Sequence, residues 1–275
     1  MPELPEVETV KRTLTELIVG KQVADVIITL PRIIQRPSDL EEFRQQLLGT
    51  TIQRIERRGK FLKIYFDGWV LVSHLRMEGK YRVEDASEPP AKHTHVRFRF
   101  SDRSELRYLD VRQFGTMHLF KAGEEETSKP LDRLGPEPLT KAFTLENFRS
   151  RMVKRKTNIK ALLLNQSFVA GLGNIYVDEA LHHAKIHPER GVATLSEEEQ
   201  EKLYDSIQST IKKAIAVGGS SVRSYVDGNG EMGMFQLQIQ VYGRKEEPCY
   251  QCGTPITRTV VAGRGTHYCS NCQKV

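Results

Sequence analysis

The stretch CYQCGTPITRTVVAGRGTHYCSNC, residues 249–272, contains all four cysteines of this 275-residue chain. They form two Cys-x-x-Cys pairs, Cys249 with Cys252 and Cys269 with Cys272, and sixteen residues separate the pairs. Each pair can present two thiolates to one tetrahedral ion, and the intervening length suits a β-hairpin. Because four thiolates leave no open coordination position, we expect one structural Zn²⁺ ion in a zinc ribbon rather than a catalytic ion. The spacing of the two pairs also disfavours redox-active or unliganded cysteines.

The residues between the two pairs include a candidate hairpin tip, Ala262-Gly263-Arg264-Gly265-Thr266. Glycines let the backbone turn sharply there and leave Arg264 projecting. A rigidly held arginine is suited to bidentate contact with phosphate, but this segment alone is equally compatible with an ordinary exposed arginine. His267 would be a fifth ligand, so we expect it to pack or to face solvent.

The rest of the chain has the composition of a globular protein, with 39% hydrophobic and 28% charged residues. No apolar run approaches the ~18 residues that a membrane span requires, so no membrane partner is expected. The acidic N-terminus lacks a signal-peptide pattern, and a secreted disulfide scaffold would spread its cysteines. These observations favour a cytoplasmic protein.

The net charge of +6 favours a polyanionic partner without proving one. A single basic run is usually a solvated face, but two clusters together shift the interpretation toward phosphate contact. The first cluster is Arg54, Arg57, Arg58, Lys60 and Lys63, and the second is Arg149, Arg151, Lys154, Arg155, Lys156 and Lys160.

The hydrophobic pattern predicts an α+β chain with a β-rich first half. Helical spacing predicts a helix over 5–19, with Pro5 in its first turn and Gly20 as its stop. Residues 22–120 read as strands, among them 51–55, 61–66, 70–74, 96–100 and 106–108, with one helix at 39–48. We therefore assign residues 1–122 to an N-terminal domain.

The second half of the chain reads as helical. A linker rich in proline and glutamate covers 123–141, and a helical domain covers 142–235. Its helices are predicted at 144–153, 158–165, 174–184 and 196–217, the last with Ser196 as N-cap. Its glycine- and serine-rich end, 218–235, is predicted to be a mobile loop, and the zinc finger completes the chain over 236–275.

The sequence Gly171-Leu172-Gly173-Asn174 joins two of the predicted helices. Free N–H groups at a helix start attract phosphate, and the Asn174 amide can add a donor. No strand precedes this turn, and neither a complete GxGxxG nor a P-loop lysine is present, so a nucleotide loop is disfavoured. A grip on backbone phosphate is the better functional interpretation, although the motif alone also fits a structural connection.

The N-terminal stretch Pro2-Glu3-Leu4-Pro5-Glu6-Val7-Glu8-Thr9 completes a combination of motifs that covers nearly the whole chain. With this start, the GLGN turn and the cysteine pairs, the chain resembles the formamidopyrimidine-DNA glycosylases, the bacterial MutM family. Further marks of the resemblance are RRGKF at 57–61, HLRM at 74–77, DVRQFG at 110–115 and GRGT at 263–266. One departure is Gln113, where a lysine is expected between Arg112 and Phe114.

The resemblance implies a two-domain enzyme of base excision repair. The N-terminal domain should be a β-sandwich flanked by helices, and the C-terminal domain should carry a helix–two-turn–helix motif and the zinc finger. The partner implied is double-stranded DNA with oxidised bases or abasic sites, bound by a monomer that associates with the bacterial nucleoid. The implied activity is excision of oxidised purines, namely 8-oxoguanine and formamidopyrimidines, followed by β,δ-elimination at the abasic site.

The implied catalytic residues are Pro2, Glu3, Lys60 and Arg264, with Glu6 in support. Removal of Met1 exposes the secondary amine of Pro2, which attacks the deoxyribose, and Glu3 beside it can transfer protons. An α-amino group, with a pKa of ~8 against ~10.4 for lysine, is more often neutral at pH 7. The alternative is that the glutamates only cap the first helix and complement its dipole. This explanation suits Glu8 and partly Glu6.

The resemblance also assigns residues to DNA and to the damaged base. The DNA contacts implied are His93, Arg112, Lys160, Asn174 and Arg264. Base extrusion leaves a hole in the duplex, and Met77, Arg112 and Phe114 match the residues that fill it. The loop over the extruded base is assigned Gly219, Ser220, Ser221, Val222, Arg223, Ser224 and Tyr225.

Two other functions remain as alternatives. A glycosylase of the endonuclease VIII type shares the mechanism but prefers oxidised pyrimidines, and the N-terminal stretch and the Arg112/Phe114 pair argue against it. A catalytically silent zinc protein that only binds DNA is the alternative from another class.

Overall fold

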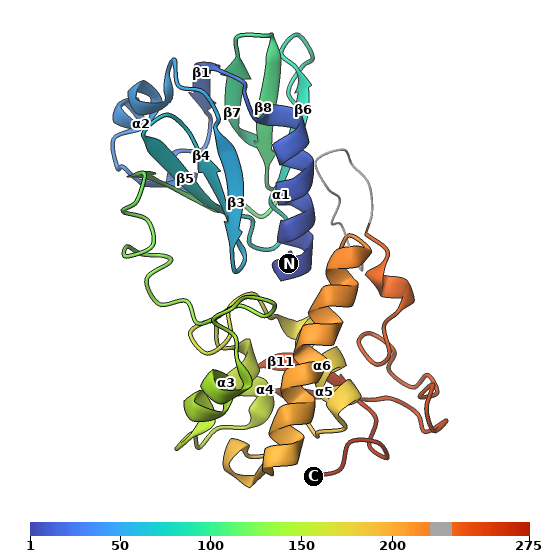
Figure 1. Ribbon diagram of the computed structural model, residues 1–275. Helices are drawn as coiled ribbons and strands as arrows, with labels where there is room; N and C mark the ends of the chain where they lie inside the picture. The colour runs from blue at the N-terminus through green and yellow to red at the C-terminus, as the bar shows by residue number, and fades with distance from the viewer. Residues whose placement is uncertain (221–232) are drawn as a thin grey trace. The chain divides into compact units, whose positions relative to one another are not determined.

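The computed structural model describes residues 1–220 and 233–275. The chain divides into two compact units: one contains Met1–Asp132 with the segment Gly218–Met234, and the other contains Arg133–Val217 with Phe235–Val275 (Figure 1). The division after Asp132 falls inside the stretch 123–141 that the sequence assigns to a linker. Residues 218–220 and 233–234, which the sequence groups with the helical domain, belong by their contacts to the N-terminal unit.

Two β-sheets form the N-terminal unit. The four-stranded sheet has the order β1 (Val23–Ile28), β7 (Thr94–Phe100), β8 (Ser104–Leu109) and β6 (Lys80–Asp85). The five-stranded sheet has the order β2 (Ile34–Arg36), β9 (Thr116–Lys121), β5 (Trp69–His74), β4 (Phe61–Tyr65) and β3 (Arg54–Arg58). All pairs are antiparallel except β2 with β9, and apolar side chains from both sheets share one core. This confirms the β-sandwich.

The helices of this unit follow the expected pattern. Helix α1 (Leu4–Ile18) packs along β3 and β4, and Val7, Leu14 and Ile18 on its inner face are fully buried. It ends before Gly20, whose φ of 86° suits glycine. Helix α2 (Leu40–Leu47) packs against β1, and the 3₁₀ turn η1 covers Pro31–Ile33.

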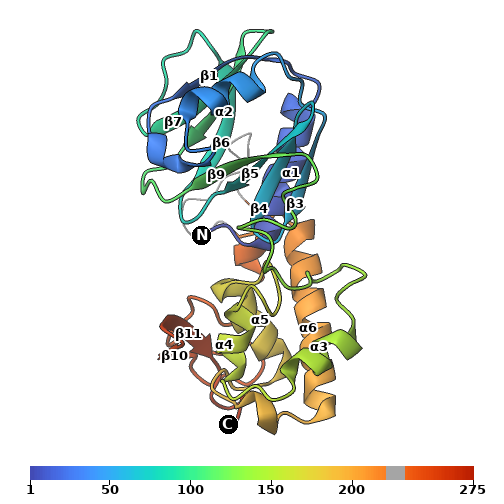
Figure 2. The same cartoon turned by 90° about the vertical axis from the view of Figure 1, so that its left-hand side faces the viewer.

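The C-terminal unit is helical and carries a hairpin. Its helices are α3 (Leu145–Met152), α4 (Ile159–Leu164), α5 (Asn174–Ala184) and α6 (Glu197–Ala216), with 3₁₀ turns η2 (Val192–Thr194) and η3 (Phe235–Leu237). The hairpin pairs β10 (Thr257–Val261) with β11 (Arg264–Tyr268), and β11 packs against α5 (Figure 2). Ser196 caps α6 by accepting the N–H of Glu199 at 3.2 Å, which confirms the predicted cap. None of the helices in the described part of the chain has the length and hydropathy to span a bilayer.

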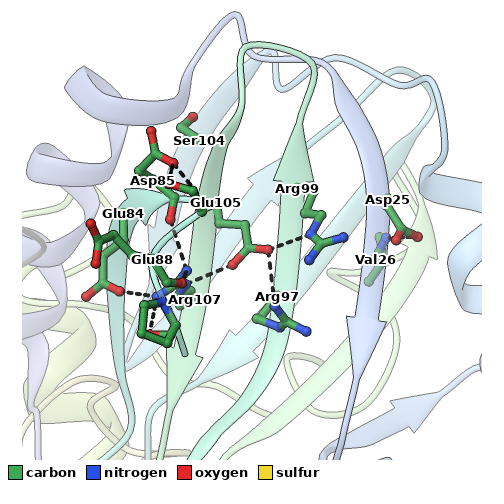
Figure 3. Close-up of polar contacts among 12 residues, drawn as sticks. Asp25, Val26, Glu84, Asp85, Glu88, Arg97, Arg99, Ser104, Glu105 and Arg107 are labelled. Atoms are coloured by element: carbon green, nitrogen blue, oxygen red, sulfur yellow. Dashed lines mark hydrogen bonds and ion pairs between the residues drawn. The ribbon is translucent and has the colours of Figure 1, made fainter. Parts of the chain in front are cut away.

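The four-stranded sheet buries charges on the face opposite the core (Figure 3). In β7, Val96, Phe98 and Phe100 are buried and arginines alternate with them, as the sequence predicts. In β8, however, Glu105 and Arg107 on the outer face are both 0% exposed. The sequence pattern alone does not indicate this burial.

Arg107 binds the chain segment that follows β6, and this segment shields the Arg107 side chain from solvent. Its guanidinium bonds the Glu105 carboxylate at 2.8 Å, the Glu84 carboxylate, and the carbonyl oxygens of Asp85 and Glu88 (Figure 3). Burial alone would raise the pKa of Glu105, but bonds from Arg99 and then Arg107 lower it overall. Glu105 is therefore ionised, and the connection from β6 to β7 is fixed by a satisfied buried charge.

Replacing Arg107 should destabilise the N-terminal unit much more than replacing its exposed neighbour. We expect Arg107→Met to lower the free energy of unfolding by about 3–5 kcal/mol, because it leaves one oxygen of the buried Glu105 carboxylate and two backbone carbonyls without the donor they now have. Arg99→Met is the comparison, because it removes a bond to the same carboxylate but no bond to the connection from β6 to β7. Urea unfolding followed through Trp69, the single tryptophan, reports on this unit. Equal losses in the two variants would contradict the expectation.

Candidate catalytic and nucleic-acid-binding sites

The first turn of α1 brings three candidate residues together in the N-terminal unit. Pro2 is buried, and Glu3 and Glu6 are 3% and 2% exposed. One carboxylate oxygen of Glu6 accepts the backbone N–H of Glu3 at 2.7 Å. This bond fixes the residue that follows Pro2, as the i to i+3 spacing of a capping box allows.

The other oxygen of Glu6 ties a distant segment to the same turn. It accepts the backbone N–H of Ser220 at 2.7 Å. Gly219 precedes this contact with a φ of 78°, and a Cβ there would lie 2.6 Å from the Glu6 oxygen. Glycine is thus required at 219 by both conformation and space. Of the seven residues assigned to the loop over the damaged base, Gly219 and Ser220 are placed, whereas Ser221, Val222, Arg223, Ser224 and Tyr225 lie outside the described residues.

The turn between β3 and β4 positions Lys60, which is 6% exposed. Arg57 supports this turn by donating to the carbonyl of Gly59 at 2.9 Å and to the carboxylate of Glu8 at 3.1 Å. Burial alone would raise the pKa of Glu8, but Lys11 and Arg57 lower it overall, so Glu8 is ionised. The turn is therefore tied to α1 by an ion pair. Glu8, which the sequence suggested only as a dipole partner, makes this tie.

The loop after β5 carries Met77 and begins at a buried histidine. Burial lowers the pKa of His74 to about 3, and the charges of Arg76 and Lys60 contribute. The neutral ring accepts the backbone N–H of Arg76 through Nδ1 at 2.9 Å, and Arg76 has a φ of 54°. This bond turns the chain so that Met77 follows as a half-buried side chain.

The loop after β8 presents Arg112 and Phe114 to solvent. Asp110 accepts the backbone N–H of Arg112 at 3.1 Å and that of Gly115 at 2.8 Å. The Arg112 guanidinium lies 4.9 Å from the centroid of the Phe114 ring, which is 52% exposed. Gln113 accepts a hydrogen bond from Arg32, which a lysine at this position could not do.

His93 meets this loop through its backbone. It has a φ of 67° and is half-buried, and its carbonyl accepts the N–H of Asp110 at 3.1 Å. Its ring centroid is 6.3 Å from that of His95.

The GLGN turn opens α5 in the C-terminal unit. Gln166 accepts the N–H of Gly171 at 2.9 Å and donates to the carbonyl of Leu172 at 2.8 Å. Gly173 is the N-cap of α5. The Asn174 side chain donates to the carbonyl of Gly265 in β11 at 2.7 Å, so the turn and the hairpin are joined.

Lys160 joins the same two elements from the interior. Its side chain is 0% exposed, and its ammonium donates to Asp178 at 2.6 Å, Thr266 at 2.7 Å and the carbonyl of Gly265 at 3.4 Å. Asp178 also accepts the N–H of His267 at 2.9 Å. A lysine that contacts phosphate presents its ammonium to solvent. The expected phosphate contact therefore does not fit the position of Lys160.

The hairpin ends in the residues expected from the sequence. Ala262 and Gly263 have φ of 51° and 70° and form the turn, and Arg264 follows as an exposed side chain at the start of β11. His267 is 9% exposed and packs against Tyr242, apart from the cysteine cluster.

The four cysteines form a metal site. The sulfur atoms of Cys249, Cys252, Cys269 and Cys272 all lie within 4.8 Å of one another. Four thiolates at ~2.3 Å from one zinc ion fit this spacing. The cluster therefore binds one zinc ion.

Sequence reasoning missed the acidic residues that fix these segments. Glu179, next to Asp178 in α5, accepts the backbone N–H groups of Gln240, Val241 and Tyr242 at 2.8–2.9 Å. Asp110 was quoted only as part of a motif. The signal that was available for Asp178 is its place one helical turn after Asn174, on the same face of α5.

Three family profiles match consecutive parts of the chain. Residues 1–117 match the formamidopyrimidine-DNA glycosylase N-terminal domain, and residues 134–226 match the H2TH domain of the same glycosylase. Residues 246–275 match the zinc finger found in FPG and IleRS.

Curated proteins and solved structures match the chain over its length. It is 56% identical over 273 residues to a formamidopyrimidine-DNA glycosylase of Shouchella clausii, and 55% identical to that of Bacillus subtilis, with 99% of both chains covered in each case. A complex of a Lactococcus lactis FPG mutant with Fapy-dG containing DNA has a TM-score of 0.94 at 44% identity, with 100% of both chains covered. A complex of the L. lactis enzyme with DNA containing an abasic site has the same TM-score and identity and covers 99% of this chain and all of the other.

Proposed function

Because this chain belongs to the formamidopyrimidine-DNA glycosylase family, we propose that it excises oxidised purines from duplex DNA through a covalent intermediate on Pro2. It then cleaves the abasic site, acting as a glycosylase and AP lyase of base excision repair. The observation that carries the proposal is the arrangement of Pro2, Glu3 and Glu6 at the start of α1. The substrates include 8-oxoguanine and formamidopyrimidines, and abasic DNA is both a substrate and a ligand.

The nucleophile is the secondary amine of Pro2, which becomes available when Met1 is removed. With Met1 in place, this nitrogen is an amide and cannot attack. The amine lies next to the positive end of α1, which disfavours a neighbouring cation and so favours the neutral, nucleophilic form. An α-amine also starts from a lower pKa than a lysine, ~8 against ~10.4.

The reaction proceeds by substitution and then elimination. The nitrogen of Pro2 bonds to C1′ of the damaged nucleotide, and the bond from C1′ to the base breaks with its electron pair leaving on the base. The nitrogen loses its proton, and the departing base takes up one proton. Opening of the sugar ring gives an iminium ion that has no N–H to lose and therefore stays cationic. This electron sink acidifies the C2′ proton and then the C4′ proton, so that the 3′ phosphate and then the 5′ phosphate depart.

Glu3 moves the protons in this scheme. Its carboxyl protonates the ring oxygen as the sugar opens, and its carboxylate later accepts a sugar proton. Supporting this assignment, the Glu6 carboxylate fixes the Glu3 backbone at 2.7 Å, so Glu6 acts as a positioning residue.

The remaining site residues bind DNA and replace the extruded base. Four residues contact the phosphate backbone around the lesion: His93, Asn174, and also Lys60 and Arg264, to which the resemblance assigns a catalytic role as well. Their assignment is supported by the exposure of Arg264 and by the turns that position the others. The hole in the duplex is filled by Met77, Arg112 and Phe114, and the solvent-exposed pair of Arg112 and Phe114 supports this assignment. Gly219 and Ser220 begin the loop over the extruded base.

Lys160 acts from inside the protein. It keeps the Gly265–Thr266 backbone, and so the adjacent Arg264, in position for phosphate. The zinc ion, when bound by its four cysteines, supplies folding energy to the same hairpin and no chemistry to the reaction. We propose that the enzyme works as a monomer and that its binding to DNA associates it with the nucleoid.

The first prediction concerns the covalent intermediate. Borohydride should reduce the iminium and trap the processed wild-type protein on 8-oxoguanine DNA. Glu3→Gln should bind that DNA with unchanged affinity but turn over at least about 100-fold more slowly, because proton transfer is lost. Glu16→Gln, an exposed position of α1, is the control and should behave like wild type. Trapping on denaturing gels and single-turnover kinetics measure these effects.

The outcome that contradicts the mechanism is equally specific. If the wild type binds abasic DNA tightly but gives no trapped adduct after removal of Met1 is verified by mass, the protein is a silent DNA-binding protein. Normal turnover by Glu3→Gln would remove Glu3 from the mechanism.

The second prediction concerns the substrate. Excision of 8-oxoguanine opposite cytosine should exceed excision of thymine glycol. The reason is that Arg112 and Phe114 are proposed to fill the hole opposite the cytosine that pairs with a purine lesion. Single-turnover rates on two duplexes of otherwise identical sequence provide the comparison. A clear preference for thymine glycol would instead favour the endonuclease VIII type.

The third prediction separates support from contact at Lys160. We expect Lys160→Met to weaken binding of abasic-site DNA without changing the slope of log Kd against log salt, because no phosphate contact is removed. Arg264→Gln is the matched comparison and should reduce the slope by about 1. An equal reduction of the slope in Lys160→Met would restore Lys160 as a phosphate ligand.

A further inference from the structure

Tyr108 lies in β8 beneath the two loops that carry the residues proposed to fill the duplex. Its side chain is 0% exposed. The loop from β5 to β6 contains Met77 and ends at Gly79, and the loop from β8 to β9 contains Arg112 and Phe114 and ends at Gly115. The two loops are connected to different strands, so a shared contact is needed to fix one relative to the other.

The hydroxyl of Tyr108 makes that contact with both glycines. A Cβ at Gly115 would lie 1.6 Å from the hydroxyl oxygen, and a Cβ at Gly79 would lie 2.3 Å from it. Neither glycine has a φ in the left-handed region, so backbone conformation does not demand glycine at these positions. At Gly115 the demand comes from the hydroxyl. At Gly79 the carbonyl of Leu75, 2.5 Å from the same Cβ, adds to it.

Asp110 connects this hydroxyl to the second loop. The Tyr108 hydroxyl donates to the Asp110 carboxylate at 3.3 Å, and the same oxygen accepts the N–H of Gly115 at 2.8 Å. The second oxygen of Asp110 accepts the N–H of Arg112. Burial and the Asp110 charge raise the pKa of Tyr108, so the hydroxyl remains a donor. The loop that carries Arg112 and Phe114 is thus bound at both ends by Asp110, which is itself hydrogen-bonded to the buried Tyr108 hydroxyl.

We propose that Tyr108, acting with Asp110, is a positioning residue that sets the spacing of the two loops and thereby the preference for the base opposite the lesion. The inference rests on the proposed function, because Met77, Arg112 and Phe114 must enter the duplex for their spacing to matter. Arg112 can select an orphaned cytosine only if it enters at the correct distance from the apolar filler. A displacement of about 1 Å at such a contact changes rates substantially.

Tyr108→Phe is the direct test, because it removes the shared contact and keeps the ring in the core. Tyr81→Phe is a matched control. Tyr81 is 1% exposed, its ring lies 5.2 Å from that of Tyr108, and its hydroxyl bonds Ser73 at 2.7 Å rather than either glycine. Both variants lose one buried hydroxyl from the same core.

Two measurements separate loop spacing from general damage. The first is the ratio of single-turnover excision rates for 8-oxoguanine opposite cytosine and opposite adenine. The second is borohydride trapping on a single-stranded oligonucleotide with an abasic site, which has no opposite base. We expect Tyr108→Phe to lower the ratio on the order of tenfold and to leave single-strand trapping within about twofold of wild type. Tyr81→Phe should change neither.

Asp110→Asn provides a second variant if Tyr108→Phe does not fold, as judged by Trp69 fluorescence. The amide keeps the shape of the carboxylate but can accept only one of the two backbone N–H groups, so the ratio should again fall. The inference is overturned if the ratio stays at the wild-type value in the folded variants, or if Tyr108→Phe loses single-strand trapping as much as duplex excision. Failure of wild type itself to trap would instead overturn the proposed function.

Discussion

A buried carboxylate that accepts backbone N–H groups is the interaction on which the functional segments depend. Glu6 accepts the N–H groups of Glu3 and Ser220, and Asp110 accepts those of Arg112 and Gly115. In the C-terminal unit, Asp178 accepts the N–H of His267, and Glu179 accepts those of residues 240–242. Apart from His267 in β11, these residues lie outside the named β-strands, so their N–H groups are not bonded within a sheet. A buried N–H without an acceptor costs about 1–3 kcal/mol, so the segment stays where the carboxylate is.

The chain accepts a real cost for this arrangement. Burial raises the pKa of Glu179 even though three backbone N–H groups act to lower it. At Asp178 the charge is matched directly, because Lys160 lies 2.6 Å away and both side chains are 0% exposed. A buried pair of this kind often contributes little net stability compared with an apolar pair, so geometric specificity is the better explanation for it. The specificity here is the position of β11 against α5.

The sequence predicts features that depend on local patterns, but it does not predict contacts between residues that are distant along the chain. Periodicity located α1 and the four helices of the C-terminal unit to within one residue at each end, because an amphipathic face is a local pattern. Cysteine spacing located the zinc site for the same reason. The burial of Glu105 and Arg107 on the outer face of β8 could not be predicted, since their alternation with apolar residues says nothing about the connection after β6 to which Arg107 bonds. Lys160 was assigned to phosphate from a basic run and from the family resemblance, whereas its burial depends on bonds to Asp178 and Thr266 that the run does not indicate.

Glycines also mark places where segments far apart in the sequence approach each other closely. Gly219 and Gly115 face polar atoms of Glu6 and Tyr108 at distances that no side chain would permit. One of them also needs its positive φ, but the other adopts a conformation open to any residue. A glycine of the second kind is informative, because only close approach explains it. Where such a glycine follows an exposed aromatic such as Phe114, the buried partner fixes the direction in which that aromatic leaves the surface. The apolar core therefore determines where the loops start, and the polar contacts beneath them determine where their side chains end.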